Sequence, residues 1–139
     1  MIDKLLELEL ESLKDGLLFS GRFYKKPIVI FNSACQCGFT RQLEDFQQLY
    51  EEGKIVPIAL PTNEFNNQEP GDNYEIIQFC RTRYNISFPV CKKTDLKHKV
   101  FQTFGTPDWN FNKYLLDHNH NFIKKFNAYT EPKELLNYV

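Results

Sequence analysis

Residues 27–40, PIVIFNSACQCGFT, hold the pattern that decides the fold. The run opens with Pro27–Phe31, which is continuously apolar and contains several β-branched side chains. Such a run predicts a strand that is buried on both faces. A short polar segment follows the strand and carries two thiols, Cys35 and Cys37. The sequence therefore predicts a buried strand that ends in a pair of cysteines.

Apolar periodicity beyond the cysteines predicts helices and a second strand. Four apolar residues recur at the spacing of one helix face: Leu43, Phe46, Leu49 and Tyr50. Gly53 is expected to end this helix. The apolar run 55–60 predicts another buried strand, in which Pro57 indicates an edge position or a bulge. Asp72 and Glu75 have the spacing of a capping box, which predicts that a helix begins there.

The two ends of the chain complete the predicted topology. Asp15-Gly16 is typical of a hairpin turn and predicts two short strands near the start of the chain. Residues 111–117 and 122–126 predict a closing hairpin. Thr130 is expected to cap a last helix, with Pro132 in its first turn. The order ββ-β-α-β-α-β-β-α predicts an α/β domain with a central sheet and helices on its faces.

Composition limits the classes of protein that the chain can represent. Its 139 residues predict one domain over residues 1–139, and the 42% hydrophobic content is that of a packed protein. A net charge of −1 gives no field that would hold nucleic acid or an anionic membrane. The first residues are too charged for a signal peptide, and no segment is long enough to span a bilayer. We therefore expect a cytoplasmic protein without nucleic acid or stable membrane association.

The position of Cys37 makes it a candidate nucleophile. We expect it just before a helix N-terminus, where unpaired N–H groups and the helix dipole favour the thiolate form. Free cysteine is also among the most buried residue types, so this feature alone fits an inert core thiol equally well. Four cysteines in a reducing compartment are not expected to form a disulfide framework.

Three motifs, in order along the chain, resemble those of the glutathione peroxidase family. Residues 32–40 resemble its Asn-Val-Ala-Ser-x-Sec/Cys-Gly-x-Thr signature, and residues 60–71 resemble its Phe-Pro-Cys-Asn-Gln-Phe-x-x-Gln-Glu-Pro-Gly motif. Trp109-Asn110-Phe111 matches its Trp-Asn-Phe motif. The similarity covers nearly the whole chain. It implies a thioredoxin-like fold with a central mixed β-sheet flanked by helices.

The resemblance also implies a catalytic site of four residues. Cys37 falls on the peroxidatic position, and Gln68, Trp109 and Asn110 fall on its three partners. The partners carry N–H donors that can stabilise a thiolate and hold the peroxide oxygens. The implied enzyme is a thiol peroxidase that reduces hydrogen peroxide and organic hydroperoxides through a sulfenic acid on Cys37. Glutathione or thioredoxin would restore the thiol as reducing co-substrate, without a metal or other cofactor.

Several positions depart from the family pattern. Thr62 replaces the cysteine of the second motif, and Gln36 stands where a lysine is frequent, which removes a cation beside Cys37. The stretch between Pro89 and Trp109 is shorter than is usual for the family. This region carries an assembly loop in tetrameric members, so its shortness implies a monomer.

The thiol that resolves the sulfenic acid is left open by the sequence. In the thioredoxin-dependent branch of the family the resolving cysteine would fall on Arg81, whereas this chain has Cys80 one position earlier. One position turns a helical side chain by roughly 100°, so Cys80 is expected to face the core. Cys80 is a possible resolving residue, and a one-cysteine cycle with an external thiol is equally open. Cys35 is close to Cys37, but a disulfide across one residue would be strained.

Two other classes of function fit parts of the sequence. Cys35-Gln36-Cys37 could serve as the redox pair of a thiol–disulfide oxidoreductase. A non-enzymatic metal carrier could use Cys35 and Cys37 with His118 or His120. The two histidines are better interpreted as solvated residues of an Asn-rich turn.

Overall fold

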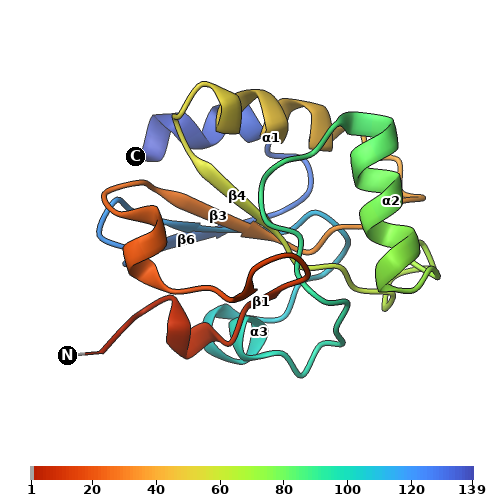
Figure 1. Ribbon diagram of the computed structural model, residues 1–139, viewed down its shortest axis with the longest axis horizontal. Helices are drawn as coiled ribbons and strands as arrows, with labels where there is room; N and C mark the ends of the chain where they lie inside the picture. The colour runs from red at the N-terminus through yellow and green to blue at the C-terminus, as the bar shows by residue number, and fades with distance from the viewer. Residues whose placement is uncertain (1) are drawn as a thin grey trace.

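A four-stranded mixed sheet forms the centre of the computed structural model, which describes residues 2–139 (Figure 1). The strands lie in the order β4 (Val56–Ala59), β3 (Ile28–Phe31), β5 (Lys113–Leu116) and β6 (Phe122–Phe126). β3 runs parallel to β4 and antiparallel to β5, and β5 runs antiparallel to β6. The expectation of a central mixed sheet with flanking helices is confirmed.

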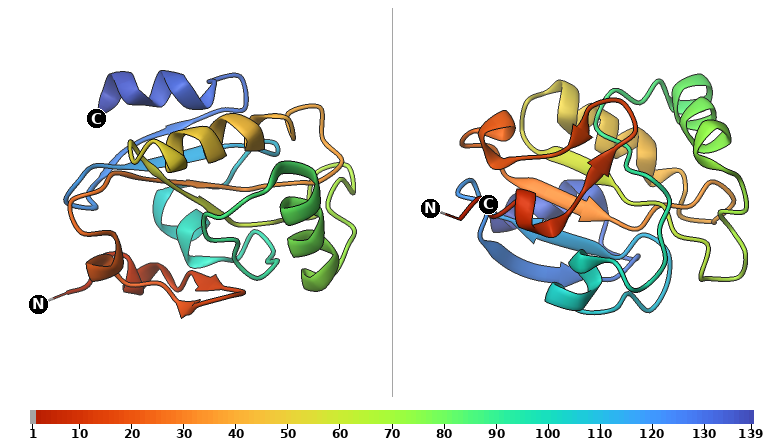
Figure 2. Two further views of the ribbon diagram at one scale, coloured as in Figure 1. Left: turned by 45° about the horizontal axis from the view of Figure 1, so that its top comes forward. Right: turned by 60° about the horizontal axis from the view of Figure 1, so that its bottom comes forward.

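Helical segments cover both faces of this sheet (Figures 1 and 2). On one face lie α1 (Gln42–Glu51) and the 3-10 helix η3 (Pro132–Tyr138), while α3 (Lys99–Phe104) lies on the other. The N-terminal segment shares the face of α3 and comprises η1 (Leu6–Leu8), β1 (Glu11–Ser12), β2 (Gly16–Leu17) and η2 (Ser20–Phe23). The helix α2 (Asn73–Tyr84) stands at one end of the sheet.

Alternating side chains of β3 divide the core into two clusters, as the two-residue period of a strand requires. Val29 and Phe31 pack in the cluster that contains α1, α2 and η3. Ile28 and Ile30 pack in the cluster that contains α3 and the N-terminal segment. All four side chains are fully buried, so the prediction of a strand covered on both faces is confirmed.

Several local predictions from the sequence are also confirmed. β4 lies at the edge of the sheet, where Pro57 costs no central ladder bond. The first helix ends at Glu51, and Gly53 follows with a positive φ of 70°. Asp72 and Glu75 form both bonds of a capping box at the start of α2.

Two features of the structure differ from the sequence-based expectation. The last helix is capped by Glu131 and not by Thr130, since the proline at position 132 holds the residue before it in an extended conformation. Helix α3 was not expected, because six residues give no readable period. Its first turn is capped by the His98 side chain, whose Nδ1 accepts from Val100 N–H at 3.1 Å.

The segment 61–71 is a structured loop without helix or strand. Asn66 and Asn67 adopt positive φ values of 56° and 51°, which asparagine tolerates better than most residues. Asn63 fastens the loop from inside, because its Oδ1 accepts from Glu69 N–H at 2.9 Å. The loop therefore presents Gln68 and Glu69 in a fixed place at the end of the sheet. Among residues 2–139, no helix has the length and apolar character needed to cross a membrane.

Candidate active site

The segment that carries the two cysteines is tied to the segment that carries Trp109 and Asn110. The Asn32 side chain donates to the Trp109 carbonyl at 2.8 Å and accepts from Asn112 N–H at 2.8 Å. The Asn32 carbonyl also accepts from Phe111 N–H at 2.8 Å. Asn32 is fully buried, so these bonds are shielded from water. They hold two distant parts of the chain together at the carboxyl end of β3.

Cys37 lies in a series of turns between β3 and α1. Its Sγ accepts a hydrogen bond from Phe39 N–H at 3.4 Å, and its own N–H donates to Thr40 Oγ1 at 3.0 Å. The Thr40 hydroxyl in turn donates to the Ala34 carbonyl at 2.7 Å. Because α1 begins at Gln42, turn residues 38–41 separate Cys37 from the helix. The hydrogen-bond donor that faces the Cys37 sulfur is therefore a backbone N–H of this turn. The expectation that Cys37 lies just before the helix is corrected, because four turn residues intervene.

Two consecutive backbone N–H groups of the cysteine segment donate to the 61–71 loop and fasten it. Gln36 N–H donates to the Gln68 carbonyl at 3.0 Å, and Cys35 N–H donates to Glu69 Oε1 at 3.0 Å. Gln68 therefore lies against the residue that directly precedes Cys37.

Gln68 and Asn110 are joined by their side chains. Asn110 Nδ2 donates to Gln68 Oε1 at 2.9 Å, which leaves the Gln68 amide N–H groups as donors. Asn110 is fully buried, and its Oδ1 has no hydrogen-bond partner in the described chain. Trp109 is half-buried and packs against Phe65, with 5.9 Å between the ring centroids.

The structure thus gathers the loops of all four residues that the family resemblance singled out. It joins Gln68 to Asn110 directly, and it fastens the Gln68 and Trp109 segments to the segment of Cys37. Within residues 2–139, Cys37 Sγ accepts from Phe39 N–H and from none of those three side chains. Their donation to the thiolate remains a prediction. Residue patterns alone did not indicate the part of Asn32, although it belongs to the first motif.

The other three cysteines occupy environments that disfavour a thiolate. Burial is the main cause in each, and it raises the pKa of Cys80 and of Cys91 to about 12. Burial also raises the pKa of the half-buried Cys35, and the adjacent Glu69 carboxylate raises it further. All four cysteines are free thiols. Cys80 is 3% exposed, which confirms the expectation that it faces the core.

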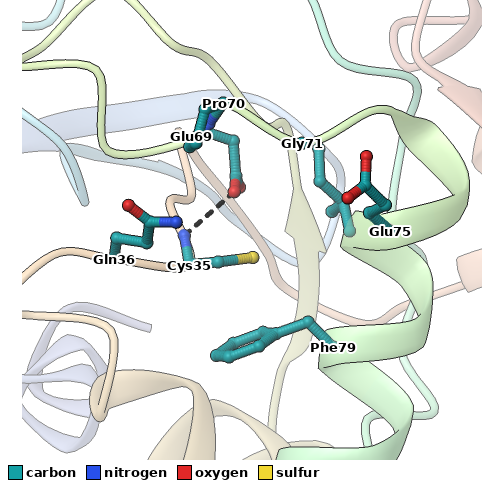
Figure 3. Close-up of a pocket in the computed structure, with 8 residues that line it drawn as sticks. Cys35, Gln36, Glu69, Pro70, Gly71, Glu75 and Phe79 are labelled. Carbon is teal, nitrogen blue, oxygen red and sulfur yellow. Dashed lines mark hydrogen bonds between the residues drawn. The ribbon is translucent and has the colours of Figure 1, made fainter.

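A cavity of about 310 Å³ opens between the cysteine segment and α2 (Figure 3). Cys35 and Glu69 lie on one side of it, and Phe79 of α2 lies on the other. Ile76 of α2 also lines it. Glu69 is only 1% exposed, and burial raises its pKa to about 7 although bonds from Cys35 and the charge of Lys93 lower it. Nothing in the sequence patterns had singled out Glu69, which simply forms part of the second motif.

The histidines do not support a metal site. His120 is buried, and its Nε2 lies 3.1 Å from the Phe23 carbonyl and 3.2 Å from the Lys26 carbonyl. The expectation that both turn histidines are solvated is therefore wrong for His120 and right for the exposed His118. No three His, Cys, Asp or Glu side chains of the described chain are grouped so that they could hold a metal ion.

Comparison with known sequences finds relatives over most of the chain. The glutathione peroxidase family profile matches residues 6–104, a range that ends before Trp109 and Asn110. The chain is 37% identical to the glutathione peroxidase homolog BsaA of Bacillus subtilis, with 81% of each chain covered. It is 30% identical to glutathione peroxidase-like peroxiredoxin 2 of Saccharomyces cerevisiae, over 97% of this chain and 94% of that one. It is 33% identical to the hydroperoxy fatty acid reductase gpx1 of Synechocystis, over 81% and 80%.

Solved structures show the same architecture at low sequence identity. The apo form of Trgpx superimposes with a TM-score of 0.71 and 18% identity, over 99% of this chain and 93% of that one. A thioredoxin-like protein from Aeropyrum pernix gives a TM-score of 0.70 and 13% identity, over 94% and 88%. The fold is therefore thioredoxin-like, and by its sequence the chain belongs to the glutathione peroxidase family.

Proposed function

We propose that this protein is a thiol peroxidase in which Cys37 attacks the peroxide. The Cys37 thiolate bonds to one peroxide oxygen, the O–O bond breaks, and the other oxygen leaves as water or an alcohol after it takes a proton. Cys37 becomes a sulfenic acid. A thiol then condenses with this acid to form a disulfide and water, and a second thiol restores Cys37 by exchange.

The observation that carries this proposal is the contrast between Cys37 and the other thiols. Cys37 is half-buried, and its sulfur faces a backbone N–H that can stabilise negative charge. Cys80 and Cys91 are buried in the core, and Cys35 lies beside a carboxylate. Cys37 is therefore the thiol whose surroundings best suit a reactive nucleophile.

We assign the activation of this nucleophile to Gln68, Trp109 and Asn110. The Asn110–Gln68 bond orients the Gln68 amide, whose remaining N–H groups are free to act on a peroxide oxygen. The Trp109 indole supplies a further N–H donor at the same end of the sheet. Donors fixed in place before the reaction stabilise the charge that moves onto the leaving oxygen.

Hydrogen peroxide and organic hydroperoxides are the proposed substrates. Synechocystis gpx1 is named for the reduction of hydroperoxy fatty acids, which supports lipid hydroperoxides as one class. Glutathione and thioredoxin are both candidate reductants. Cys80 would serve as a resolving residue only after α2 opens, because its side chain is buried. We further propose a cytoplasmic monomer with one domain over residues 1–139.

The alternative of a Cys35–Cys37 dithiol oxidoreductase has less support. The first thiol of such a pair should be a good leaving group, whereas burial and Glu69 raise the pKa of Cys35. Likeness to thioredoxin-like structures at 13–18% identity concerns the fold alone.

Peroxide consumption, measured in parallel with glutathione and with a thioredoxin system, tests the proposal. The unaltered protein and Cys91→Ala should consume hydrogen peroxide and an organic hydroperoxide, because Cys91 lies in the other core cluster. Cys37→Ser should lose this activity with either reductant. In the unaltered protein, mass spectrometry should find the first oxidation on Cys37. Undiminished turnover by Cys37→Ser would contradict the assignment.

A further inference from the structure

Cys35 is placed where it would compete with Cys37 for oxidation. It lies two positions away in the chain, it is half-buried, and it lines the 310 Å³ cavity (Figure 3). Its sulfur points from the loop toward α2, so small molecules that enter the cavity meet it. Position alone does not make this thiol inert.

Burial is the largest cause of the raised pKa of Cys35, and Glu69 is the charged group that adds to it. Its carboxylate accepts from Cys35 N–H at 3.0 Å, yet it is only 1% exposed. A carboxylate that is shielded from water repels a second negative charge far more strongly than one in solvent. The N–H bond also fixes the Cys35 backbone against Glu69, so the two groups stay together.

We propose that Glu69 is a specificity-determining residue whose charge adds to burial in keeping Cys35 protonated, so that oxidation and thiol exchange remain on Cys37. The inference rests on the proposed peroxidase function, since it concerns the fate of the oxidised Cys37. Glu69 does not touch the peroxide in this scheme, and it acts through Cys35.

The reaction that Glu69 prevents is an internal dead end. A Cys35 thiolate would attack the Cys37 sulfenic sulfur, an S–S bond would form, and the S–OH oxygen would leave as water after it takes a proton. Cys35 would be oxidised and the sulfenic sulfur reduced, both to the disulfide level. A disulfide across one residue has poor geometry, and it would occupy the sulfur that the external thiol must reach.

Other titratable groups near Cys35 and Glu69 are Lys93, Cys80 and Glu75. Lys93 acts on Glu69 and lowers its pKa, and its Nζ donates to the Gly71 carbonyl at 2.8 Å. From α2, Cys80 adds to the rise in the pKa of Cys35, and Glu75 lines the same cavity. Glu75 is a second glutamate of this cavity, and it accepts from Asp72 N–H at 3.1 Å in the capping box. It therefore serves as a matched control for Glu69.

Alkylation of Cys35 by iodoacetamide tests the proposal without peroxide turnover. In a Cys37→Ser background, the tryptic peptide that ends at Arg41 reports Cys35 alone. Glu69→Gln keeps an oxygen for the Cys35 N–H but removes the charge. It should alkylate Cys35 about tenfold faster at pH 8, which corresponds to a fall of about one unit in the thiol pKa. Glu69→Asp and Glu75→Gln should stay near the rate of the Cys37→Ser parent.

The pH dependence separates charge from simple opening of the cavity. With Glu69 present, the logarithm of the Cys35 rate should rise with pH, flatten as the carboxyl ionises near pH 7, and rise again. This measurement needs no Glu69 variant. A straight line of unit slope from pH 6 to 9, a gain in Glu69→Gln that is equal at every pH, or an equal gain in Glu75→Gln would overturn the proposal. A failure of the proposed peroxidase function would appear in a different experiment, as undiminished peroxide turnover by Cys37→Ser.

Discussion

Replacement of Asn32 by leucine should lower the stability of the folded protein, although the volume of the side chain hardly changes. The substitution removes the donor to the Trp109 carbonyl and the acceptor of Asn112 N–H. The Trp109 carbonyl keeps a bond from Asn112 Nδ2 at 3.0 Å, so loss of its bond from Asn32 costs about 1 kcal/mol of stability. Asn112 is 1% exposed, and its stranded N–H adds about 1–3 kcal/mol. We expect the free energy of unfolding to fall by about 2–4 kcal/mol.

Urea denaturation measures this loss as a lower midpoint at an unchanged slope. Asn119→Leu is the matched control, since Asn119 is exposed in a turn and should change stability by no more than about 0.5 kcal/mol. Peroxide turnover by the fraction of Asn32→Leu that remains folded should also slow, because the Trp109-Asn110 segment is no longer held against the cysteine segment. A stability loss below about 1 kcal/mol would show that Asn32 does not tie the two segments together.

Three further predictions follow from the site and from the buried ionisable groups. Gln68→Glu and Asn110→Asp should slow peroxide attack by about 10²-fold in stopped-flow measurements, and normal rates would argue against their role as donors. Burial lowers the pKa of Lys113 from 10.5 to about 7, so the unfolded chain binds more protons above pH 7 and stability should rise with pH between about 7 and 9. Lys113→Met should lose this rise in unfolding experiments. Burial raises the pKa of Glu69 from 4.5 to about 7, so the folded chain binds more protons in that window and stability should fall as pH rises through it. Glu69→Gln should show no such fall in stability. If the fall persists in this variant, it belongs to another titratable group.

Local patterns in the sequence predicted those parts of the fold that local forces determine. The buried run at Pro27–Phe31, the edge proline and the Asp72 capping box all depend on neighbouring residues, and all three were predicted correctly. The short helix α3 has too few residues for a period and is capped by the side chain of His98. His120 is buried because it binds carbonyls nearly a hundred positions away, and no turn pattern indicates such a bond.

The site was less accessible to such reasoning than the fold. Gln68 and Asn110 lie 42 positions apart, so only the family resemblance suggested that they meet. The same resemblance marked Cys37 but gave no sign of the Phe39 N–H that faces its sulfur. Glu69 went unnoticed because its effect depends on burial beside Cys35, which the sequence does not display.

The bond between Asn32 and Trp109 has a consequence for the newly made protein. It spans 77 positions, so the cysteine segment leaves the ribosome long before the segment that completes its surroundings. At roughly 5–20 residues per second, the delay is on the order of 4–15 s. Throughout that interval Cys37 lies on an unfinished chain that lacks Trp109 and Asn110, two of the side chains that we propose activate it. Under the proposed mechanism, oxidants present during synthesis would therefore meet a fully activated Cys37 only after Trp109 has bonded to Asn32.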